Sequence, residues 1–584
     1  MKRRQSNYDK FPSIRVPVRR HSVWQGWREV VARIGAEVAG GAKNIAVELY
    51  PGVFEKEVLE AFVDGLHPVH VFRTSDCWKE PPEIEAMVGT DLTDDPVFGR
   101  ISQLAINDFA DAERTAQLRE NCRSAVGLTL VFGTGTSLLT PEPDVLILAD
   151  LARWEIQRRQ RANQIGNFPA GGMRESAAAK YKRAFFVDWR VADRIKQPLI
   201  DRVDYLLDTN DPAAPKMCTG EDFRLGLRCA VNRPFRVVPF FDPGPWGGQW
   251  MREVCDLPDG PPNYAWCFDC VPEENSLLLD MSGVKIEIPA MDLVLHHPRE
   301  LLGDSVYARF GSEFPIRFDF LDTMQGGNLS LQVHPLDQYI IENFGMAYTQ
   351  DESYYLLDAA PDACVFLGQK TGIDRTAMIS ELRHAQENGA PFEASTYVNR
   401  WPARKHDHFL IPAGTIHCSG ANSMVLEISA TPYIFTFKLW DWGRPGLDGR
   451  PRSIHLEHGA ANIQWNRDTE WVRKNLLNRV ETIGEGKEWI EERTGLHELE
   501  FIETRRHWFS TLVEHDASVG VHVVNLVEGQ EAIVESPSAA FEPFSIHYAE
   551  TFIVPAKAGR YSVRPAEGVG NCATIRAAVR TAAA

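Results

Sequence analysis

Four side chains between positions 332 and 417 have the chemistry to bind one metal ion. Gln332 and His334 lie two residues apart in the segment LSLQVHP, and alternate residues of an extended strand point to the same face. Glu352 in DESYYLL and His417 in LIPAGTIH add a carboxylate and a second imidazole. These donors suit zinc or another divalent metal and leave coordination positions for a substrate. The pattern predicts a metalloenzyme.

Each of these residues also has an ordinary structural explanation. Gln332 would suit the surface of a strand and Glu352 a solvated turn. A lone buried histidine is more often a hydrogen-bonded core residue than a metal ligand. The segments around the four residues therefore carry more weight than the residues themselves.

These segments resemble class I mannose-6-phosphate isomerases (phosphomannose isomerases) of the short bacterial type. The resemblance rests on the stretch 298–358, on FLIPAGTIHCSG, VLEIS and LWDWGR, on PWGGQW around Trp246–Trp250 and on the tail AETFIVPAKAGRY. It covers roughly residues 232 to 584 with the motifs in the same order, which is more specific than any single motif. It implies a cupin barrel that binds one Zn²⁺ per chain, or another divalent metal, through Gln332, His334, Glu352 and His417.

The reaction implied by the resemblance is the interconversion of an aldose and a ketose through a cis-enediol, most simply mannose 6-phosphate to fructose 6-phosphate. Lys438 and Arg444 are expected to bind the enediolate or the phosphate. Glu427, Lys438 and Asp441 are candidates for the general base. The structural alternative for Lys438 and Arg444 is an exposed, salt-bridged turn.

Three departures from the family pattern leave other functions open. Lys438 stands where the family usually has an arginine, which keeps the charge but loses the bidentate fork. Ile434 stands where an aspartate is usual, and YAWCFDCVPEENS lacks the acidic residue of the family's AESW-like segment. One alternative is an isomerase of a different sugar, and another is a non-catalytic, sugar-binding regulatory protein.

The first two hundred residues predict an α/β domain with a largely parallel sheet, because short apolar runs alternate with helical patterns. The runs lie at 44–50, 68–73, 128–135, 144–150 and 183–189. Their order weakly resembles a P-loop sugar or nucleoside kinase, but NIAVELYPGVFEKE lacks GxxxxGK[ST], and GTGTS at 133–137 is interpreted as a tight turn. We expect a catalytically inert, degenerate kinase-like domain that binds a ligand, supports a dimer or braces the barrel.

The sequence therefore predicts a multidomain chain in which an α/β domain precedes a β-rich cupin region (a double-stranded β-helix). The expected domains are a kinase-like domain at 1–215, a metal-binding cupin domain at 232–465 and a second cupin-like domain at 466–584. A linker rich in turn-forming residues is expected near 206–240. Within the cupin region, a small helical insertion is expected at 376–389 and further helix at 466–494.

Composition restricts the partners. A formal net charge of -18 and a pI near 5.5 argue against a general nucleic-acid binder. The sequence contains no run of eighteen apolar residues, so it predicts no membrane span. Its ten scattered cysteines fit reduced thiols in the cytoplasm. The expected partner is a sugar-phosphate substrate, with no nucleic acid and no membrane, and a homo-oligomer remains open.

Two further motifs have weaker chemical potential. His406 and His408 form an HxH pair whose spacing suits cupin metal sites, but the family places its metal elsewhere, so polar residues at the pocket rim are the favoured interpretation. Cys267 and Cys270 form a single CxxC, which is interpreted as a pair of reduced structural thiols.

Overall fold

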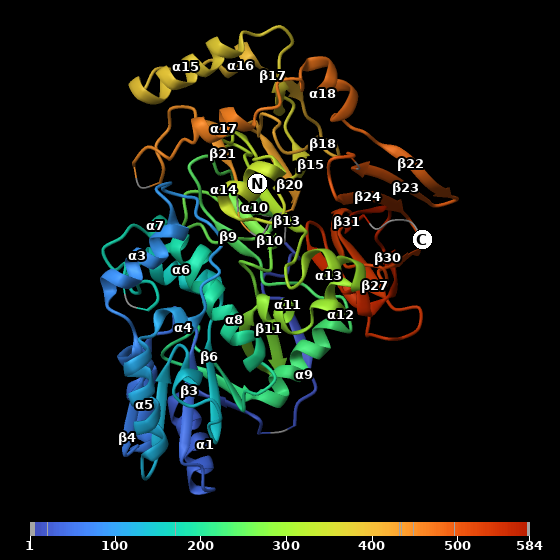
Figure 1. The fold of residues 1–584 in the computed structure, drawn as a ribbon. Helices are drawn as coiled ribbons and strands as arrows, with labels where there is room; N and C mark the ends of the chain where they lie inside the picture. Colours follow the sequence, from blue (N-terminus) through green and yellow to red (C-terminus); the bar gives the residue numbers. More distant parts are fainter. Residues whose placement is uncertain are drawn as a thin grey trace. The chain divides into compact units, whose positions relative to one another are not determined.

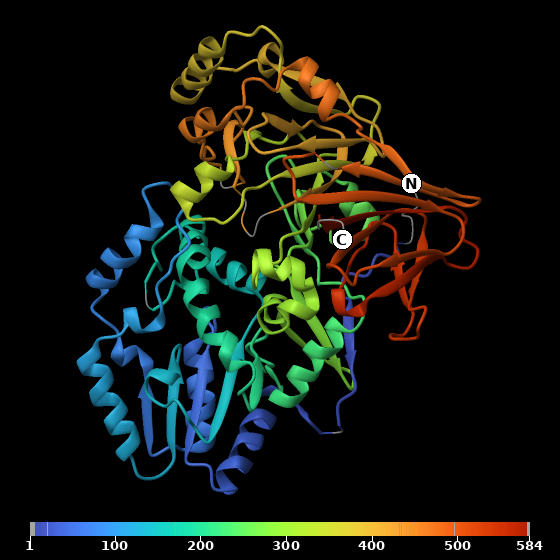
Figure 2. The same ribbon diagram turned by 45° about the vertical axis from the view of Figure 1, so that its right-hand side comes forward.

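The computed structural model describes residues 6–19, 21–169, 171–430, 433, 435–447, 449–495 and 497–580. The chain divides into two compact units, each assembled from segments that are distant in sequence (Figures 1 and 2). One unit combines Met1–Pro12, Val231–Asn275 and Pro298–Ala584, and is called the barrel unit below. The other combines Ser13–Ala230 and Ser276–His297, and is called the α/β unit.

The α/β unit contains a seven-stranded sheet in the order β2-β8-β7-β6-β3-β5-β4. Its strands are β2 Val23–Gln25, β3 Asn44–Leu49, β4 His70–Arg73, β5 Thr129–Gly133, β6 Val145–Asp150, β7 Tyr205–Asp208 and β8 Lys216–Thr219. The five strands from β7 to β4 in this order are parallel, whereas β8 pairs antiparallel with β7 and β2 pairs antiparallel with β8 at one edge. The central strands β5 and β6 are buried along their whole length, as apolar strands of a covered parallel sheet should be.

Helices separate these strands along the chain. They are α1 Gly26–Ala39, α2 Glu55–Leu66, α3 Pro81–Leu92, α4 Ile106–Phe109, α5 Ala112–Ser124, α6 Arg153–Arg161, α7 Ala177–Arg183, α8 Trp189–Leu199 and α9 Gly220–Val231, with short helices η1 Thr74–Cys77 and η2 Thr136–Leu138 and a π-helical turn η3 Ala184–Asp188. The sheet between helices agrees with the expected α/β character of this region.

Two local predictions in this unit are wrong. The run at 183–189 is helical, because η3 joins α7 to α8 there and both Phe185 and Phe186 are buried. A short, continuously apolar run has no periodicity that separates a buried strand from a buried helix. The supposed linker at 206–240 instead contains β7, β8 and α9, because the apolar pair at Leu206 and Leu207 fills the next position in the sheet.

The turn GTGTS encloses a protein carboxylate. Glu48 at the end of β3 is 3% exposed, and its carboxylate accepts hydrogen bonds from the backbone N–H of Gly135 at 2.6 Å and from the N–H of Thr136 at 2.8 Å. The Thr136 hydroxyl donates a third bond at 2.6 Å. These donors are occupied by the chain itself, so they are not presented to a phosphate.

A second, three-stranded sheet brings residues 276–297 into the α/β unit. β1 Ser13–Val16 runs parallel to β11 Ser276–Met281, which pairs with β12 Val284–Pro289. Helix α11 Met291–His296 follows, and the structure groups this whole segment with the α/β unit rather than with the rest of 232–465. The chain thus leaves the barrel unit at residue 275 and returns to it at 298.

The first barrel of the barrel unit consists of two antiparallel sheets. The six-stranded sheet has the order β18 His408–Ile411, β15 Glu352–Ala359, β20 Ser423–Ser429, β13 Arg317–Asp322, β10 Trp266–Cys270 and β9 Phe240–Asp242. The five-stranded sheet has the order β17 Val398–Pro402, β16 Cys364–Gln369, β19 His417–Ser419, β14 Leu331–Val333 and β21 Phe437–Trp440. Two such sheets built from interleaved strands are the double-sheet arrangement of cupins.

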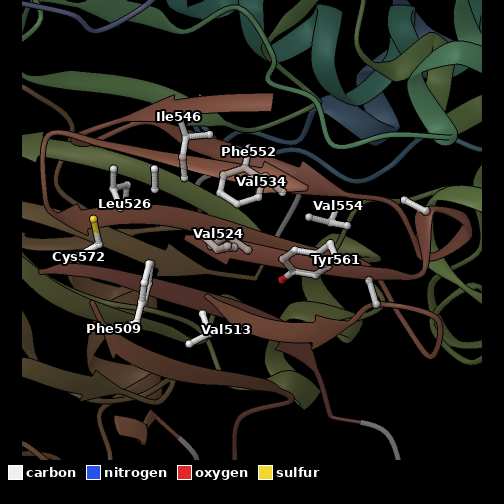
Figure 3. Close-up of a cluster of buried hydrophobic side chains, with 14 residues drawn as sticks. Phe509, Val513, Val524, Leu526, Val534, Ile546, Phe552, Val554, Tyr561 and Cys572 are labelled. Atoms are coloured by element: carbon white, nitrogen blue, oxygen red, sulfur yellow. The ribbon is translucent and has the colours of Figure 1, made fainter. Parts of the chain in front are cut away.

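A second pair of antiparallel sheets follows. One has the order β22 Glu481–Gly486, β23 Trp489–Gly495, β24 Ile502–Phe509, β31 Cys572–Val579, β26 His522–Glu528 and β29 Thr551–Val554, and the other β25 Val513–Asp516, β30 Arg560–Pro565, β27 Glu531–Glu535 and β28 Phe544–His547. Figure 3 shows the side chains that fill this barrel, among them Phe509, Leu526, Phe552 and Tyr561, all at most 2% exposed. This interior is a packed apolar core.

Short helices connect the strands of the barrel unit. They are α10 Trp250–Val254, α12 Pro298–Leu302, α13 Asp304–Phe310, α14 Asp337–Phe344, α15 Arg375–Asn388, α16 Ala394–Tyr397, α17 Leu456–Asn462, α18 Thr469–Asn475 and η4 Ala556–Ala558. The expected insertion at 376–389 corresponds to α15. The expected helix at 466–494 is confined to α18, because the charged residues after it form the hairpin β22 and β23, where alternate side chains can remain solvated.

Candidate metal centre

Strand pairing brings the four predicted ligands together inside the first barrel. Gln332 on β14 is paired with His417, the first residue of β19, in the five-stranded sheet. His334 directly follows β14, and Glu352 is the first residue of β15 in the six-stranded sheet. Gln332 is 7% exposed, Glu352 is 2% exposed, and both histidines are fully buried.

The donor atoms of three of these residues converge. Glu352 Oε2 lies 3.0 Å from His334 Nε2, and Glu352 Oε1 lies 2.8 Å from His417 Nε2. Within the part of the chain that the structure describes, no other group of three His, Cys, Asp or Glu side chains has donor atoms within 4.8 Å of one another. The amide nitrogen of Gln332 lies 3.1 Å from His417 Nε2. Rotation of this amide by half a turn would place its oxygen at the same position.

Backbone carbonyls orient both imidazoles. His334 Nδ1 lies 2.7 Å from the carbonyl oxygen of Phe435, and His417 Nδ1 lies 2.8 Å from that of Thr415. A carbonyl oxygen can only accept, so each Nδ1 carries a proton, and Nε2 is the ring nitrogen left to bind a metal. This is the tautomer that a metal-binding histidine needs.

The electrostatics of the cluster match a cation site. Burial alone would raise the pKa of Glu352, but the adjacent His334 and His417 together hold it well below its ordinary value. Burial would lower the pKa of His334, yet Glu352 raises it overall. Two neutral imidazoles, a carboxylate and an amide oxygen would fit a divalent metal in this buried position.

Gln350, which lies outside the predicted set, supports Glu352. The Gln350 amide donates to Glu352 Oε2 at 3.0 Å, and its oxygen accepts a hydrogen bond from the backbone N–H of Phe435 at 3.0 Å. Phe435 also accepts from His334, so Gln350 ties two ligands to one backbone position. The sequence could have indicated this contact only through the segment QDESYY. Alternation along an extended strand places Gln350 on the same face as Glu352.

The turn that carries His417 is held by a buried arginine. Arg467 is 5% exposed, and its Nη1 donates to the carbonyl oxygens of Pro412 at 2.7 Å and Ala413 at 2.5 Å and to the Thr415 hydroxyl at 2.6 Å. The sequence offered no local signal for this contact, because Arg467 lies some fifty residues after the turn.

The predicted catalytic residues occupy different environments. Lys438 on β21 is paired with Gln332, so the two side chains share a face of the five-stranded sheet. Glu427 on β20 is paired with Tyr354 and therefore lies on the face that carries Glu352. Burial raises the pKa of Glu427 well above its ordinary value, and the neighbouring Glu352 adds to the effect. Ile434 lies outside the described residues.

Arg444 is engaged within the protein. Its Nη2 is 2.8 Å from Asp441 Oδ1, and its Nη1 donates to the carbonyl oxygen of Asn328. Arg452 approaches the other Asp441 oxygen at 3.0 Å. The Arg444 guanidinium is thus held in a mostly buried ion pair, not in the exposed turn of the structural alternative, and Asp441 lies between two cations. The catalytic role of Arg444 stays a prediction.

The remaining motifs lie apart from the four ligands. His408 is paired with Tyr355, one residue out of phase with Tyr354, so it faces the opposite side of the sheet from Glu352. Burial lowers the pKa of His408 to about 3. Cys267 and Cys270 are buried free thiols whose pKa values are raised by burial, as in inert structural cysteines.

The chain has informative similarities to known proteins. A family model described as a domain of unknown function (DUF8485) matches residues 26–232. Mannose-6-phosphate isomerase ManA of Bacillus subtilis (strain 168) is 29% identical over 239 residues, which cover 40% of this chain and 69% of that protein. Mannose-6-phosphate isomerase of Streptococcus mutans serotype c is 28% identical over 214 residues, which cover 36% of this chain and 62% of that protein.

Among solved structures, the mannose 6-phosphate isomerase from Bacillus subtilis matches 59% of this chain and 100% of its own length, with a TM-score of 0.49 and 18% identity. Because this structural similarity is low, we assign the fold from the strand order of the chain's own sheets. No described helix combines the length and apolar character that a membrane-spanning segment requires.

Fold and site together define a multidomain cupin protein with a buried cluster of potential metal ligands. By sequence, this chain is homologous to the mannose-6-phosphate isomerase family over about 40% of its length.

Proposed function

We propose that this chain is a metal-dependent aldose–ketose isomerase acting on a sugar phosphate, with mannose 6-phosphate and fructose 6-phosphate as the first pair to test. The observation that carries the proposal is the convergence of His334, Glu352 and His417 inside a cupin barrel. Homology to proteins named mannose-6-phosphate isomerases supports the same reaction class.

We assign the metal, zinc, to His334, Glu352 and His417, with the Gln332 oxygen as the fourth donor. When bound, the ion would act as a Lewis acid that stabilises negative charge on the sugar oxygens. The chain's own contribution is to fix the donors, since Phe435 and Thr415 orient the imidazoles and Gln350 holds the carboxylate.

The reaction removes the C2 proton of the aldose and returns a proton to C1, while another proton moves between the C1 and C2 oxygens. We assign Lys438 the role of a cation that stabilises negative charge on the substrate. Its pairing with Gln332 places its side chain on the same face of the sheet as this metal ligand. Glu427 is assigned to the proton-handling side, since its register places it on the face that carries Glu352, where burial raises its pKa.

The direct experiment combines metal analysis with a substrate panel. Zinc-reconstituted protein is assayed with phosphorylated and free aldoses, beside His417→Ala and a matched control, His384→Ala, in which an exposed histidine of α15 is removed. We expect one equivalent of zinc and turnover of mannose 6-phosphate, both lost in His417→Ala and kept in His384→Ala. Turnover of another sugar alone would replace the substrate. Bound zinc without turnover on any sugar would overturn the catalytic assignment.

For the α/β unit we propose a kinase-like domain that does not transfer phosphoryl groups. Its first parallel strand, β3, lies at the centre of the sheet between β5 and β6, and leads into α2 through a segment without the P-loop glycines and lysine. Glu48 occupies the donors of the other glycine-containing turn. Incubation of the full chain with ATP and magnesium should release no ADP above the buffer blank, and sustained release would contradict this assignment.

A further inference from the structure

The α/β unit contains a cavity of about 380 Å³ that the isomerase assignment does not use. It opens where β4 and β5 end and α2 begins. Ligands of open α/β sheets bind outside the carboxyl ends of the strands, and a few hundred cubic ångströms is the usual size of a small-molecule site. Its lining comes entirely from residues 55–169, whereas the metal ligands lie at 332–417.

The ends of the two strands are packed tightly at the base of the cavity. Gly133 has a φ of +127°, and a Cβ at this position would lie 2.1 Å from the Thr74 hydroxyl oxygen. A side chain at position 133 is therefore excluded both by the backbone conformation and by Thr74 at the start of η1. The adjacent Thr134 hydroxyl is tied to the carbonyl oxygen of Leu49 at 2.8 Å, which fixes this edge relative to β3.

One wall is aromatic. Trp78, Phe132 and Phe168 line the cavity and are at most 8% exposed. Trp78 and Phe168 meet edge to face with ring centroids 5.3 Å apart, and the ring of Phe109 packs against Phe168 at the same centroid distance of 5.3 Å. Such a wall suits the flat or apolar face of a ring.

The lining also includes hydrogen-bond donors. Arg73 and Lys56 bring cationic groups, and Thr74 and Ser75 bring hydroxyls. Helix α2 begins at Glu55 without a side-chain cap, so the backbone N–H groups of its first turn are further donors, beside the acidic side chains of Glu55 and Glu57. Arg73 interacts electrostatically with Glu55, which also lines the cavity. Burial raises the pKa of Glu55, and the positive charge of Arg73 opposes the rise.

We propose that this cavity is a binding site for a small phosphate ester of a hydroxylated ring. The phosphate would lie between Arg73 and the start of α2, where donors gather, and the ring would lie against Trp78 and Phe168. Glu60, which also lines the cavity and pairs with Lys56 at 3.8 Å, would accept hydrogen bonds from ring hydroxyls. Sugar phosphates and nucleoside monophosphates share this chemistry, and the test separates them.

The test uses the full chain and isothermal titration calorimetry with three probes: inorganic phosphate, mannose 6-phosphate and adenosine 5′-monophosphate. Each probe is titrated into the unsubstituted chain, Arg73→Gln, Arg123→Gln and His417→Ala. Arg123 is a matched control, because its guanidinium is 79% exposed on α5 and pairs only with Glu120 among the described residues. Melting temperatures of all four proteins verify that they are folded.

We expect saturable binding of one ring phosphate with a Kd below 1 mM, weakened at least about tenfold by Arg73→Gln and unchanged by Arg123→Gln. Binding should persist in His417→Ala, which separates this site from the metal centre and keeps its failure distinct from failure of the proposed isomerase. Binding of mannose 6-phosphate alone identifies a sugar-phosphate site, and binding of adenosine 5′-monophosphate alone a nucleotide site. The proposal would be overturned if neither ring phosphate binds. It would also be overturned if the Kd is the same in Arg73→Gln as in the unsubstituted chain, or if His417→Ala abolishes binding.

Discussion

At the scale of single residues, Lys438 is the residue on which the proposed chemistry depends most. Its charge matches the arginine expected from the family resemblance, and its register places it beside Gln332. Lys438→Met should lower kcat by about 10²- to 10³-fold, the usual effect of removing one electrostatic contact to a transition state. Zinc content should remain at one equivalent.

Lys438→Arg serves as the matched charge-conserving variant. It should recover part of the activity, since an arginine restores the cation and adds a planar pair of donors. Kinetic constants and zinc analysis on the same preparations distinguish a role in chemistry from a role in metal binding. Unchanged kcat in Lys438→Met would remove this lysine from the mechanism.

Glu48 makes a second prediction at this scale, on the pH dependence of stability. Burial raises its pKa to about 7 although three hydrogen bonds oppose the shift. Between about pH 4.5 and 7 the folded state therefore holds a proton that the unfolded state releases, so stability falls as pH rises through this range. The shift from 4.5 to about 7 corresponds to about 3 kcal/mol.

The measurement is the free energy of unfolding of the α/β unit's transition in the full chain, from pH 5 to pH 8. Glu48→Gln should flatten the decline relative to the unsubstituted chain. Glu120→Gln, at an exposed position of α5, should leave the slope unchanged. Identical slopes for all three proteins would show that Glu48 does not titrate in this range.

At the scale of elements, a buried lysine holds the inserted segment in the α/β unit. Lys196 on α8 lies 2.8 Å from Asp150 at the end of β6 and 2.9 Å from Asp292 on α11. All three side chains are at most 2% exposed. The ammonium group thus joins an element of residues 276–297 to the parallel sheet.

Lys196→Met should destabilise this unit by about 3–5 kcal/mol, because it leaves two carboxylates buried without their cation. Asp292→Asn combined with Lys196→Met should recover part of the loss. Lys474→Met on α18, where the side chain is exposed, provides the control. Chemical denaturation measures all four proteins, and a loss below about 1 kcal/mol for Lys196→Met would show that this network does not anchor the segment.

At the scale of the whole molecule, neither unit is a continuous stretch of sequence. The N-terminal residues belong to the barrel unit, where the Tyr8 hydroxyl donates to Asp269 at 2.6 Å and the backbone N–H of Asp9 donates to Glu550 at 2.6 Å. Arg236 pairs with Glu550 at 2.8 Å in the same buried cluster. A fragment comprising 232–584 would lose the N-terminal contacts and keep residues 276–297 without β1.

We therefore expect the fragment 232–584 to be poorly soluble or to melt at least about 5 °C below the barrel transition of the full chain. Exposure of the β11 edge and loss of partners for buried polar groups are the physical reasons. Scanning calorimetry and the soluble fraction on expression measure the effect. A fragment as soluble and as stable as the full chain would mean that the N-terminal segment contributes nothing to the barrel.

The sequence by itself determined the residue types of the metal centre, because the alternation of Gln332 and His334 is local and the surrounding motifs keep their order. It also predicted most strands of the parallel sheet, whose apolar runs reflect burial on both faces. It could not separate helix from strand at 183–189, since a short apolar run has no distinguishing period.

Tertiary structure alone decided the contacts between distant segments. Pairing of β14 with β19 and β21 placed His417 and Lys438 beside Gln332, and Arg444 turned toward Asp441. Glu48 filled the glycine turn, and residues 276–297 joined the α/β unit. These outcomes depend on which strands become neighbours and which charges are buried together, and neither property is encoded in the spacing of residues along one segment.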